Sequence, residues 1–121
     1  VGQRIGVKVH AFEPGAAPTM RIEDVLVEAA GRDSAVVVLH VENPGRRPLR
    51  PEGRIELRTF EGEVVRSVPV EAFGLLPEHR REVRAAVGLE GLAPGRYLVI
   101  PILDYGGASL LAAQREFEVS G

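Results

Sequence analysis

Apolar residues in this chain recur at every second position, and Gly or Pro interrupts the runs. In residues 53–71, Ile55 and Leu57 alternate with charged residues before Glu61 and Gly62 mark a tight hairpin. Alternation with a period of two is typical of a half-buried β-strand, because successive side chains of a strand point to opposite faces. Runs of this kind, joined by short turns, predict an all-β fold.

The predicted strands are spaced almost evenly along the chain. They cover residues 4–12, 20–29, 34–43, 53–59, 63–71, 80–89, 97–103 and 109–119. Residues 34–43 are nearly continuously apolar, which predicts a central strand covered on both faces. Residues 108–113 have some helical propensity but are too few for a helix. We therefore predict an immunoglobulin-like β-sandwich of seven or eight mostly antiparallel strands.

Two of these strands allow a prediction of which side chains share a face. In residues 20–29, strict alternation puts Ile22 beside Asp24 and Leu26, so one polar position is misplaced. Val25 and Val27 would lie on the opposite face. In the strand after the Glu61 and Gly62 turn, four side chains are predicted to share a face, namely Val64, Arg66, Val68 and Val70.

Length and composition restrict the classes of protein. A chain of 121 residues suits a single domain, and we expect residues 1–121 to form one. No run approaches the roughly 20 apolar residues of a membrane helix, so no membrane insertion is expected. The absence of cysteine excludes disulfides, thiol catalysis and cysteine-based zinc sites. Only one Asn and one Met are present, which favours a thermophilic source, although an Arg-rich and Ala-rich usage also fits a GC-rich genome.

Charged residues are numerous but do not form a recognisable binding motif. The net charge of −2 argues against a nucleic-acid partner or an anionic membrane surface. Two basic groups stand out, the first at Arg46, Arg47 and Arg50 and the second at Arg80, Arg81 and Arg84. No aromatic residues interleave them, as a nucleic-acid platform would require. We expect a solubilising surface there, and the alternative is a patch for an acidic polymer or partner.

Catalytic patterns are missing from the sequence. No serine lies in a nucleophile elbow, and the histidines His10, His40 and His79 lack metal-ligand spacing. The carboxylates alternate with arginines, which suggests cross-strand ion pairs in place of a glycosidase pair. We therefore expect a protein that is not an enzyme and has no cofactor or metal.

The N-terminal stretch has the clearest amphipathic pattern. Ile5, Val7, Val9 and Ala11 fall on one face of residues 4–12, and the Pro-rich and Gly-rich residues 13–19 read as a connection. Residues 1–12 either pair as the first strand of this domain or act as a donor strand that completes the sheet of another subunit. A head-to-tail donation of this kind does not close on itself and would propagate as a fibre.

The segment LAPGRYLV, residues 92–99, resembles the turn and tyrosine of immunoglobulin-like and fibronectin-like sandwiches. The resemblance implies a structural corner at Pro94, Gly95 and Tyr97, where the tyrosine hydroxyl bonds back to upstream backbone. Together with VENPGRRPLRPEGRIELRTFEGEV, LLPEHRREV and LDYGG, it is similar to immunoglobulin-like modules of bacterial envelope and pilus-associated proteins. The similarity covers about residues 20–119 and rests on the spacing of strands and turns.

Two hypotheses about function follow. In the first, the chain is a secreted, periplasmic or cell-surface structural protein that works by protein association, as a pilus-like fibre subunit or an assembly accessory. Ile5, Val7, Val9 and Ala11 would then be the partner-binding residues. In the second, it is a small carbohydrate-binding or protein-binding module associated with a larger secreted protein. The absence of Trp counts against a sugar platform.

Overall fold

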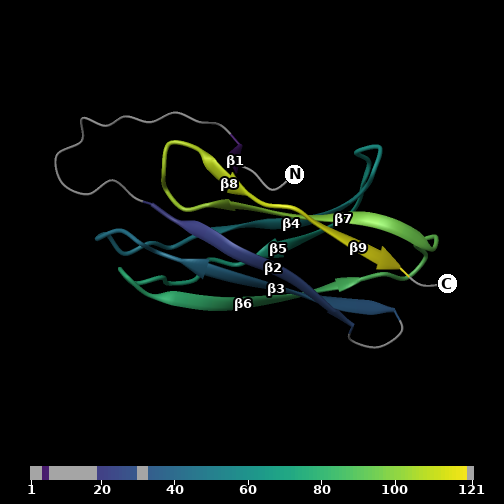
Figure 1. Cartoon of the computed structure of the whole chain (residues 1–121), viewed down its shortest axis with the longest axis horizontal. Coiled ribbons are helices and arrows are strands. Elements are labelled where there is room, and N and C mark those ends of the chain that lie inside the picture. The colour runs from purple at the N-terminus through teal and green to yellow at the C-terminus, as the bar shows by residue number, and fades with distance from the viewer. Residues whose placement is uncertain (1–3, 6–18, 30–32, 120–121) are drawn as a thin grey trace.

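The computed structural model describes residues 4–5, 19–29 and 33–119 of the chain. These residues form strands joined by turns and loops, and no helix occurs among them (Figure 1). The strands are β1 (Arg4–Ile5), β2 (Arg21–Ala29), β3 (Ser34–Glu42), β4 (Glu52–Thr59), β5 (Val64–Val70), β6 (Arg80–Gly88), β7 (Gly95–Asp104), β8 (Leu110–Ala112) and β9 (Arg115–Val119).

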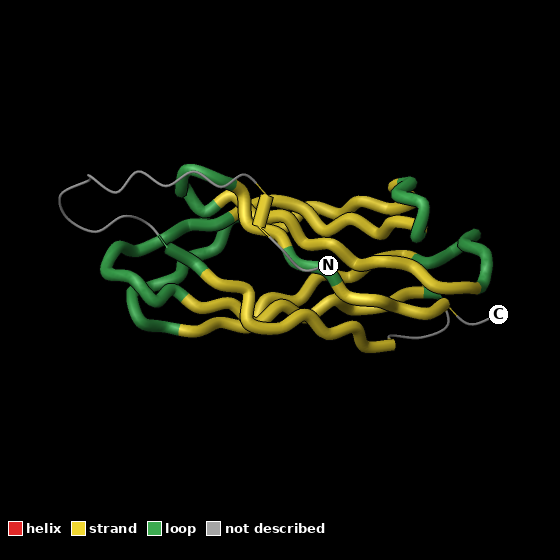
Figure 2. Tube along the Cα trace, turned by 45° about the horizontal axis from the view of Figure 1, so that its top comes forward, coloured by secondary structure: helices red, strands yellow, loops and turns green. Residues whose placement is uncertain are grey.

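The strands build two antiparallel sheets that pack face to face (Figures 1 and 2). The larger sheet has six strands in the order β1-β8-β7-β4-β5, with β9 also paired to β7, and the smaller has three in the order β2-β3-β6. The predicted β-sandwich is confirmed. The strand predicted over residues 109–119 occurs as two pieces, β8 and β9, which pair with successive parts of β7.

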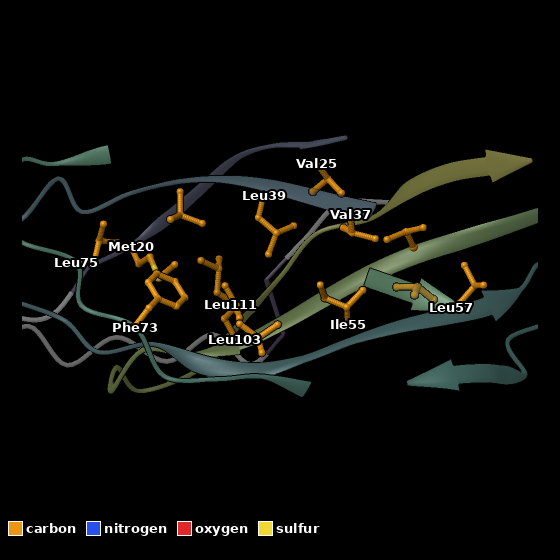
Figure 3. Packing of buried hydrophobic residues seen from close by; sticks show 14 of the residues in the cluster. Met20, Val25, Val37, Leu39, Ile55, Leu57, Phe73, Leu75, Leu103 and Leu111 are labelled. Carbon is orange, nitrogen blue, oxygen red and sulfur yellow. The ribbon is translucent and has the colours of Figure 1, made fainter. Parts of the chain in front are cut away.

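The hydrophobic core lies between the sheets (Figure 3). Its centre is formed by β3 and β7, where Leu39 and Leu103 are both 0% exposed and Val37 is 1% exposed. Ile55 and Leu57 of β4 complete this layer from the larger sheet. Each side chain of this size contributes about 1.5–3 kcal/mol when it is fully buried. The centre of the core is therefore aliphatic, and the aromatic residues Phe73 and Tyr97 complete the cluster.

A β-bulge in β2 corrects the predicted faces of that strand. The pairing with β3 shifts between Ile22 and Asp24, so one extra residue is inserted there. The shift moves Ile22 to the core side with Val25 and Val27, because a one-residue insertion reverses the face of every residue beyond it. Asp24 no longer shares a face with Ile22, and the misplaced polar position disappears.

A second bulge corrects the prediction for β5. The register with β4 shifts between Leu57 and Arg58, which pair with Arg66 and Val64 respectively. Arg66 and Val68 stay on the core side, whereas Val64 lies opposite the outward-facing Arg58 and is 46% exposed. The expectation that Val64 shares a face with Arg66 is therefore wrong, since strict alternation does not hold across the bulge.

Arginines from edge strands cross both open sides of the sandwich. Arg66 of β5 donates from Nε to the carbonyl oxygen of Gly88 at 3.1 Å and also bonds the carbonyl oxygen of Glu90. On the other side, Arg115 of β9 lies 3.6 Å from the Asp24 carboxylate of β2. Inward-pointing charges on edge strands discourage pairing with a further chain, because an added strand would have to displace them.

The only asparagine, Asn43, connects the loop after β3 to the loop before β6. Its side chain is 0% exposed, and its Nδ2 donates to the carbonyl oxygens of Arg47 at 2.7 Å and Leu75 at 3.1 Å. Its Oδ1 accepts from the Gly45 N–H at 3.0 Å. A buried amide with all of these partners ties the two loops together where no regular strand pairing does.

The backbone of Asn43 strengthens the same connection. Its N–H donates to the carbonyl oxygen of His79 at 3.0 Å, and its carbonyl oxygen accepts from the Glu78 N–H at 2.7 Å. Glu78 has a φ of 61°, a left-handed conformation that is uncommon outside glycine. The Asn43 contacts therefore hold a loop whose backbone is unfavourable on its own.

We expect Asn43→Ala to lower the free energy of unfolding by about 2 kcal/mol, because the Arg47 carbonyl and the Gly45 N–H lose their partner. The measurement is urea unfolding followed by circular dichroism, with Glu90→Ala as a control at an exposed position. The control should shift the midpoint very little. An equal shift in both variants would show that the Asn43 network does not stabilise the fold.

Candidate interaction surface

The histidines and carboxylates of the described residues do not gather into a metal-binding cluster. No cluster of three or more His, Asp or Glu side chains that could hold a metal occurs among them. His40 lies on β3 between Asp24 and Glu82 in register, and His79 donates from Nδ1 to the carbonyl oxygen of Pro77 at 2.8 Å. His10 lies outside the described residues. In the part of the chain that the structure describes, no helix is long and apolar enough to cross a membrane.

The second basic group is engaged in contacts within the domain. Arg80 lies 3.2 Å from the carboxylate of Glu23, and Arg81 donates to the carbonyl oxygen of Gly74 at 3.0 Å. The guanidinium of Arg81 also stacks over the Phe73 ring, 5.5 Å from its centroid. These contacts hold the side chains of Arg80 and Arg81 against other residues of the same domain.

Arg84, the third member of that group, bridges two carboxylates. It lies 3.1 Å from Glu28 and 2.7 Å from Glu82. The hydrogen bonds that Arg84 donates to Glu28 and Glu82, and then the negative charges of these carboxylates, raise the pKa of Arg84. Of the first basic group, Arg46 and Arg50 lie exposed in the loop between β3 and β4.

Each sheet has an aliphatic central strand, but the outer faces of the two sheets differ. On the smaller sheet, Val38 points away from the core and is nevertheless only 1% exposed. Its lateral neighbours in register are Leu26 and Arg84, and Arg84 is held across the face by its two carboxylates. Neighbouring side chains therefore cover the middle of this outer face.

The outer face of the larger sheet has partly accessible aliphatic residues at consecutive outward positions of its central strand. Leu98, Ile100 and Ile102 alternate along β7 with the core residues, so they form a stripe on the side away from the core. Leu98 and Ile100 are half-buried, and only Ile102, which is 3% exposed, is well covered. We call these residues the β7 stripe. Solvent-facing positions of antiparallel sheets are usually polar, so the stripe is a candidate interaction surface.

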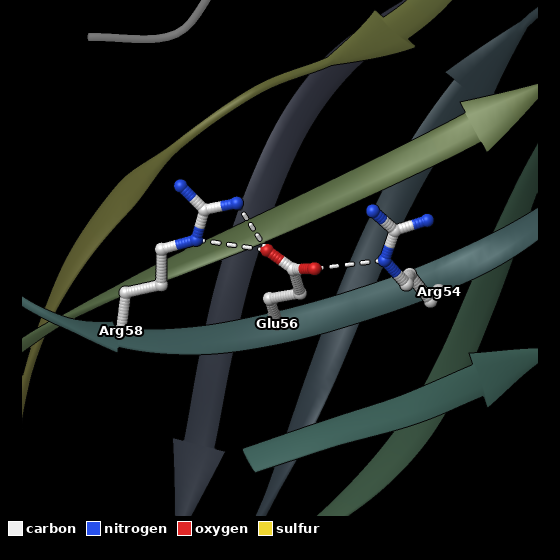
Figure 4. A network of polar contacts seen from close by, with 3 residues as sticks. All are labelled: Arg54, Glu56 and Arg58. Atoms are coloured by element: carbon white, nitrogen blue, oxygen red, sulfur yellow. Dashed lines mark hydrogen bonds and ion pairs between the residues drawn. The ribbon is translucent and has the colours of Figure 1, made fainter. Parts of the chain in front are cut away.

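A charged cluster on β4 flanks the β7 stripe (Figure 4). Glu56 lies beside Ile100 in register and accepts hydrogen bonds from Arg54 Nε at Oε2 and from Arg58 Nε at Oε1, each at 2.8 Å. Arg58 Nη2 also contacts Glu56 Oε1. Glu56 is only 7% exposed, which its two cationic partners make possible.

The pKa of Glu56 reflects two opposing effects. Burial raises the pKa of this carboxyl, since desolvation disfavours the charged form. Hydrogen bonds from Arg54 and Arg58, together with their positive charges, outweigh burial and lower the pKa below its ordinary value. Glu56 is therefore ionised at neutral pH, which makes it unsuitable as a proton donor there.

The structure places only part of the predicted N-terminal contact residues. Ile5 lies in β1, where it pairs with Leu110 while Arg4 pairs with Leu111. Both partners belong to β8 of the same chain. Val7, Val9 and Ala11 lie outside the described residues. The described part of this segment thus extends the domain's own sheet, and donation to another subunit stays a prediction.

The predicted corner lies at the start of β7. The Tyr97 hydroxyl donates to the carbonyl oxygen of Ala93 at 2.6 Å, across the turn that contains Pro94 and Gly95. Gly95 has a φ of 147°, and the Tyr97 side chain is 7% exposed. The contribution of this corner to stability stays a prediction.

Sequence reasoning missed the β7 stripe and the Glu56 cluster. Alternation already put Glu56 between two arginines on one face, but it did not show that this carboxylate is buried. The strong apolar run in β7 was visible as well. An apolar run of this kind occurs in a strand that is covered on both faces and also in one whose outer face is open. Only the side chains of the neighbouring strands distinguish the two cases.

Comparisons with solved structures identify sandwich domains inside much larger proteins. A β-glucuronidase from glycoside hydrolase family 2 matches 87% of this chain with a TM-score of 0.64 and 11% identity. β-Glucosidase 3B from Thermotoga neapolitana matches 86% with a TM-score of 0.60 and 16% identity, and a β-glucosidase from Kluyveromyces marxianus matches 88% with a TM-score of 0.53 and 17% identity.

The chain spans only a small part of these proteins, namely 11%, 16% and 14% of their respective lengths. At this level of identity the likeness shows a shared fold and no shared activity. No family model matches the chain, and neither does any curated protein. The comparisons show no pilus-specific similarity.

We expect Glu56→Gln to be less stable than the unsubstituted protein at pH 7 by about 2 kcal/mol, since hydrogen bonds to a charged group are lost. The folded-state pKa of Glu56 is lowered, so its stabilisation is present above the ordinary value of 4.5 and is lost as the pH falls through the lower folded-state pKa. Urea unfolding at a series of pH values measures the difference.

The control for this experiment is Glu90→Gln, which removes an exposed carboxylate. Its difference from the unsubstituted protein should stay small over the whole pH range. A Glu56→Gln difference that does not shrink in acid would contradict the assigned role of the ionised carboxylate.

We expect removal of residues 1–12 to leave the assembly state unchanged, because Arg4 and Ile5 pair with β8 of their own chain. Light scattering on the full and shortened chains over a range of concentrations measures this. If the full chain forms large open-ended assemblies that disappear on truncation and return when residues 1–12 are added as a peptide, this segment is an intermolecular donor strand.

Proposed function

We propose that this chain is a non-catalytic β-sandwich module that binds protein through the outer face of its larger sheet. In this proposal it acts as an accessory to a larger secreted or cell-surface protein. The observation that supports it best is the β7 stripe, whose Leu98 and Ile100 are only half-buried in the middle of a sheet. A rigid sheet bears them, so little conformational entropy would be lost when a partner covers them.

The contrast between the two sheets supports this choice of surface. Val38, the equivalent outward residue on the smaller sheet, is covered by its neighbours within the domain. The β7 stripe lacks such cover at Leu98 and Ile100, although the long side chains of Arg54 and Arg58 lie on the next strand. These arginines bond the Glu56 carboxylate. The half-buried outward residues of the smaller sheet, Leu26 and Val36, lie on two different strands, whereas Leu98 and Ile100 are consecutive outward positions of one strand. We therefore choose the larger sheet as the docking surface.

The non-catalytic part of the proposal has separate support. No cluster of described side chains could hold a metal ion, and the one buried carboxylate among the described residues, that of Glu56, is bonded by two arginines. The glycosidases that are similar in fold are several times longer, and the chain covers 16% or less of the length of each of these three proteins. This small share of each larger protein supports a role for the chain as one domain among several.

Carbohydrate binding is the second candidate, since the solved structures similar in fold include a β-glucuronidase and β-glucosidases. Sugar-binding surfaces commonly stack the sugar on aromatic rings. Among the described aromatic residues, only Phe60 is largely exposed to solvent, at 49%. Phe73 and Tyr97 are buried in the core. The shortage of exposed rings favours protein over sugar as the ligand.

We expect the double variant Leu98→Thr/Ile100→Thr to elute clearly earlier from a hydrophobic interaction column than the unsubstituted protein, because it removes apolar surface that solvent can reach. Thr keeps the β-branched shape that suits a strand. The matched control is Leu26→Thr/Val36→Thr, which changes two half-buried outward residues of the smaller sheet.

The same preparations should be titrated calorimetrically with β-linked gluco-oligosaccharides and galacto-oligosaccharides. We expect no binding heat. Equal retention of the two double variants would show that the β7 stripe is not a distinctive docking surface, and saturable sugar binding would favour the carbohydrate candidate.

A further inference from the structure

We propose that the open edge of β6 binds an extended peptide segment of a partner protein, which adds to the smaller sheet as a further strand. The segment has apolar residues at alternate positions and a basic residue opposite Glu82. The inference goes beyond the proposed function, because this edge belongs to the smaller sheet and not to the β7 stripe.

β6 is an outer strand of the smaller sheet and pairs there with β3 (Figure 1). The other described outer strands are poor templates for an added strand. β2 and β5 each contain a bulge, β5 also contains Pro69, and β1 has only two residues. β9 is short, and its Arg115 reaches across to β2. In contrast, β6 has nine residues in continuous register with β3 and contains no proline. Long, regular edges of this kind pair readily with another chain.

Bonds at the two ends of β6 show which of its backbone groups face outward. The carbonyl oxygen of His79 accepts from the N–H of Asn43, which follows β3. The Leu89 N–H donates to the carbonyl oxygen of Asp33, which precedes β3. In an antiparallel strand the backbone groups of successive residues point alternately to one side and the other. Odd-numbered residues of β6 therefore bond to β3, and even-numbered residues direct their N–H and C=O groups to the open edge.

Arginine side chains occupy the two ends of this edge. Gly88, an even-numbered residue, directs its carbonyl oxygen to Arg66 of β5, as the alternation requires. At the other end, Arg81 stacks over Phe73. The even-numbered residues between these arginines are Glu82, Arg84 and Ala86, which we call the β6 edge. Each of them offers one N–H donor and one C=O acceptor to an added strand.

A groove of about 610 Å³ runs along the β6 edge. Residues 81–86 all line it, including both inward and outward side chains, so the groove follows the edge of the strand and not one of its faces. The opposite wall includes Val68 and Val70 of β5. On the β6 side, Val83 and Ala85 pack against the core. The inward side chains of an added strand would therefore meet apolar groups of both sheets.

Charges on the outer face beside the edge favour a basic segment. Asp24 is offset by Arg115, which lies 3.6 Å away. The remaining ion-pair network has three arginines against four carboxylates, namely Arg21, Arg80 and Arg84 against Glu23, Glu28, Glu42 and Glu82. One negative charge is left over, and Glu82 is the carboxylate that lies on the edge strand. An unlike charge directly opposite Glu82 in an added strand is stabilising.

Amide hydrogen exchange followed by NMR tests the geometry, with the peptide acetyl-Thr-Val-Thr-Val-Lys-amide as the probe. In the unbound chain, the amides of Glu82, Arg84 and Ala86 should exchange much faster than those of Val83 and Ala85, which bond to β3. We expect a dissociation constant on the order of 0.1–1 mM, because main-chain hydrogen bonds and two valines must offset the ordering of the peptide. A peptide concentration about ten times this constant should slow exchange at the three outward amides about tenfold.

A second peptide tests the charge selection. Acetyl-Thr-Val-Thr-Val-Glu-amide puts a like charge opposite Glu82 and should bind about threefold more weakly. Glu82 is exposed, so Glu82→Lys leaves the core intact, and this variant should prefer the Glu peptide over the Lys peptide. If the two peptides bind equally to both proteins, the basic partner is wrong.

A proline variant tests the main-chain contact. Ala86→Pro removes an N–H that β3 does not use, so the fold should persist while peptide binding weakens at least tenfold. Ala86→Thr keeps this N–H and should bind within about twofold of the unsubstituted protein. Thermal unfolding followed by circular dichroism shows whether both variants fold. If Ala86→Pro does not, the exchange pattern and the Glu82→Lys reversal decide the question.

Exchange at the β6 edge that stays unchanged up to about 5 mM of the Lys peptide would overturn the inference. Protection of these amides that grows with protein concentration in the absence of peptide would show that a second copy occupies the edge, and would overturn the assignment to a partner segment. The variant Leu98→Thr/Ile100→Thr should bind the peptide like the unsubstituted protein. Failure here therefore leaves the proposed function of the β7 stripe untouched.

Discussion

The central strand of each sheet is aliphatic on both of its faces, whereas a sandwich of two sheets can bury only one face of each against the core. In β3 and β7 the inward residues, Leu39 and Leu103 among them, are completely buried. The outward residues need some other cover. On the smaller sheet, Val38 is covered within the domain, because Arg84 is held beside it by Glu28 and Glu82. On the larger sheet, Ile102 is covered, whereas the consecutive outward residues Leu98 and Ile100 are only half-buried.

That difference arises from how the ion pairs are arranged. Arg84 lies on an edge strand and bonds a carboxylate on the far strand of its sheet, so its side chain extends across the central strand. Arg54 and Arg58 instead bond Glu56 on their own strand, so these contacts run along β4 beside the stripe. Ion pairs at exposed positions contribute little to stability in themselves. Here the direction of the ion pairs matters for the aliphatic side chain beside them. The pair across the smaller sheet covers Val38, whereas the pairs along β4 leave Ile100 partly accessible.

The sandwich and most of its strands could be predicted from alternation and turn residues, because both depend on local sequence. The faces of β2 and β5 could not, since each contains a bulge whose position depends on pairing with a neighbour. The burial of Asn43 could not be predicted from the sequence either. Its position before Pro44 marked the end of a strand, but its partners Leu75 and His79 come from a loop more than thirty residues away. Long-range contacts of this kind leave no periodic signal in the sequence.

The same limit applies to the candidate site. Periodicity drew attention to the N-terminal stretch, where an amphipathic pattern is unambiguous, yet the described part of it pairs with β8. The β7 stripe has a weaker signal, because an apolar run such as YLVIPIL fits a strand with two covered faces equally well. What distinguishes the stripe is the side chains next to it in the sheet, and these come from β4 and β9. A binding face on a β-sandwich is therefore a property of strand order, and it becomes visible only when the register of three strands is known.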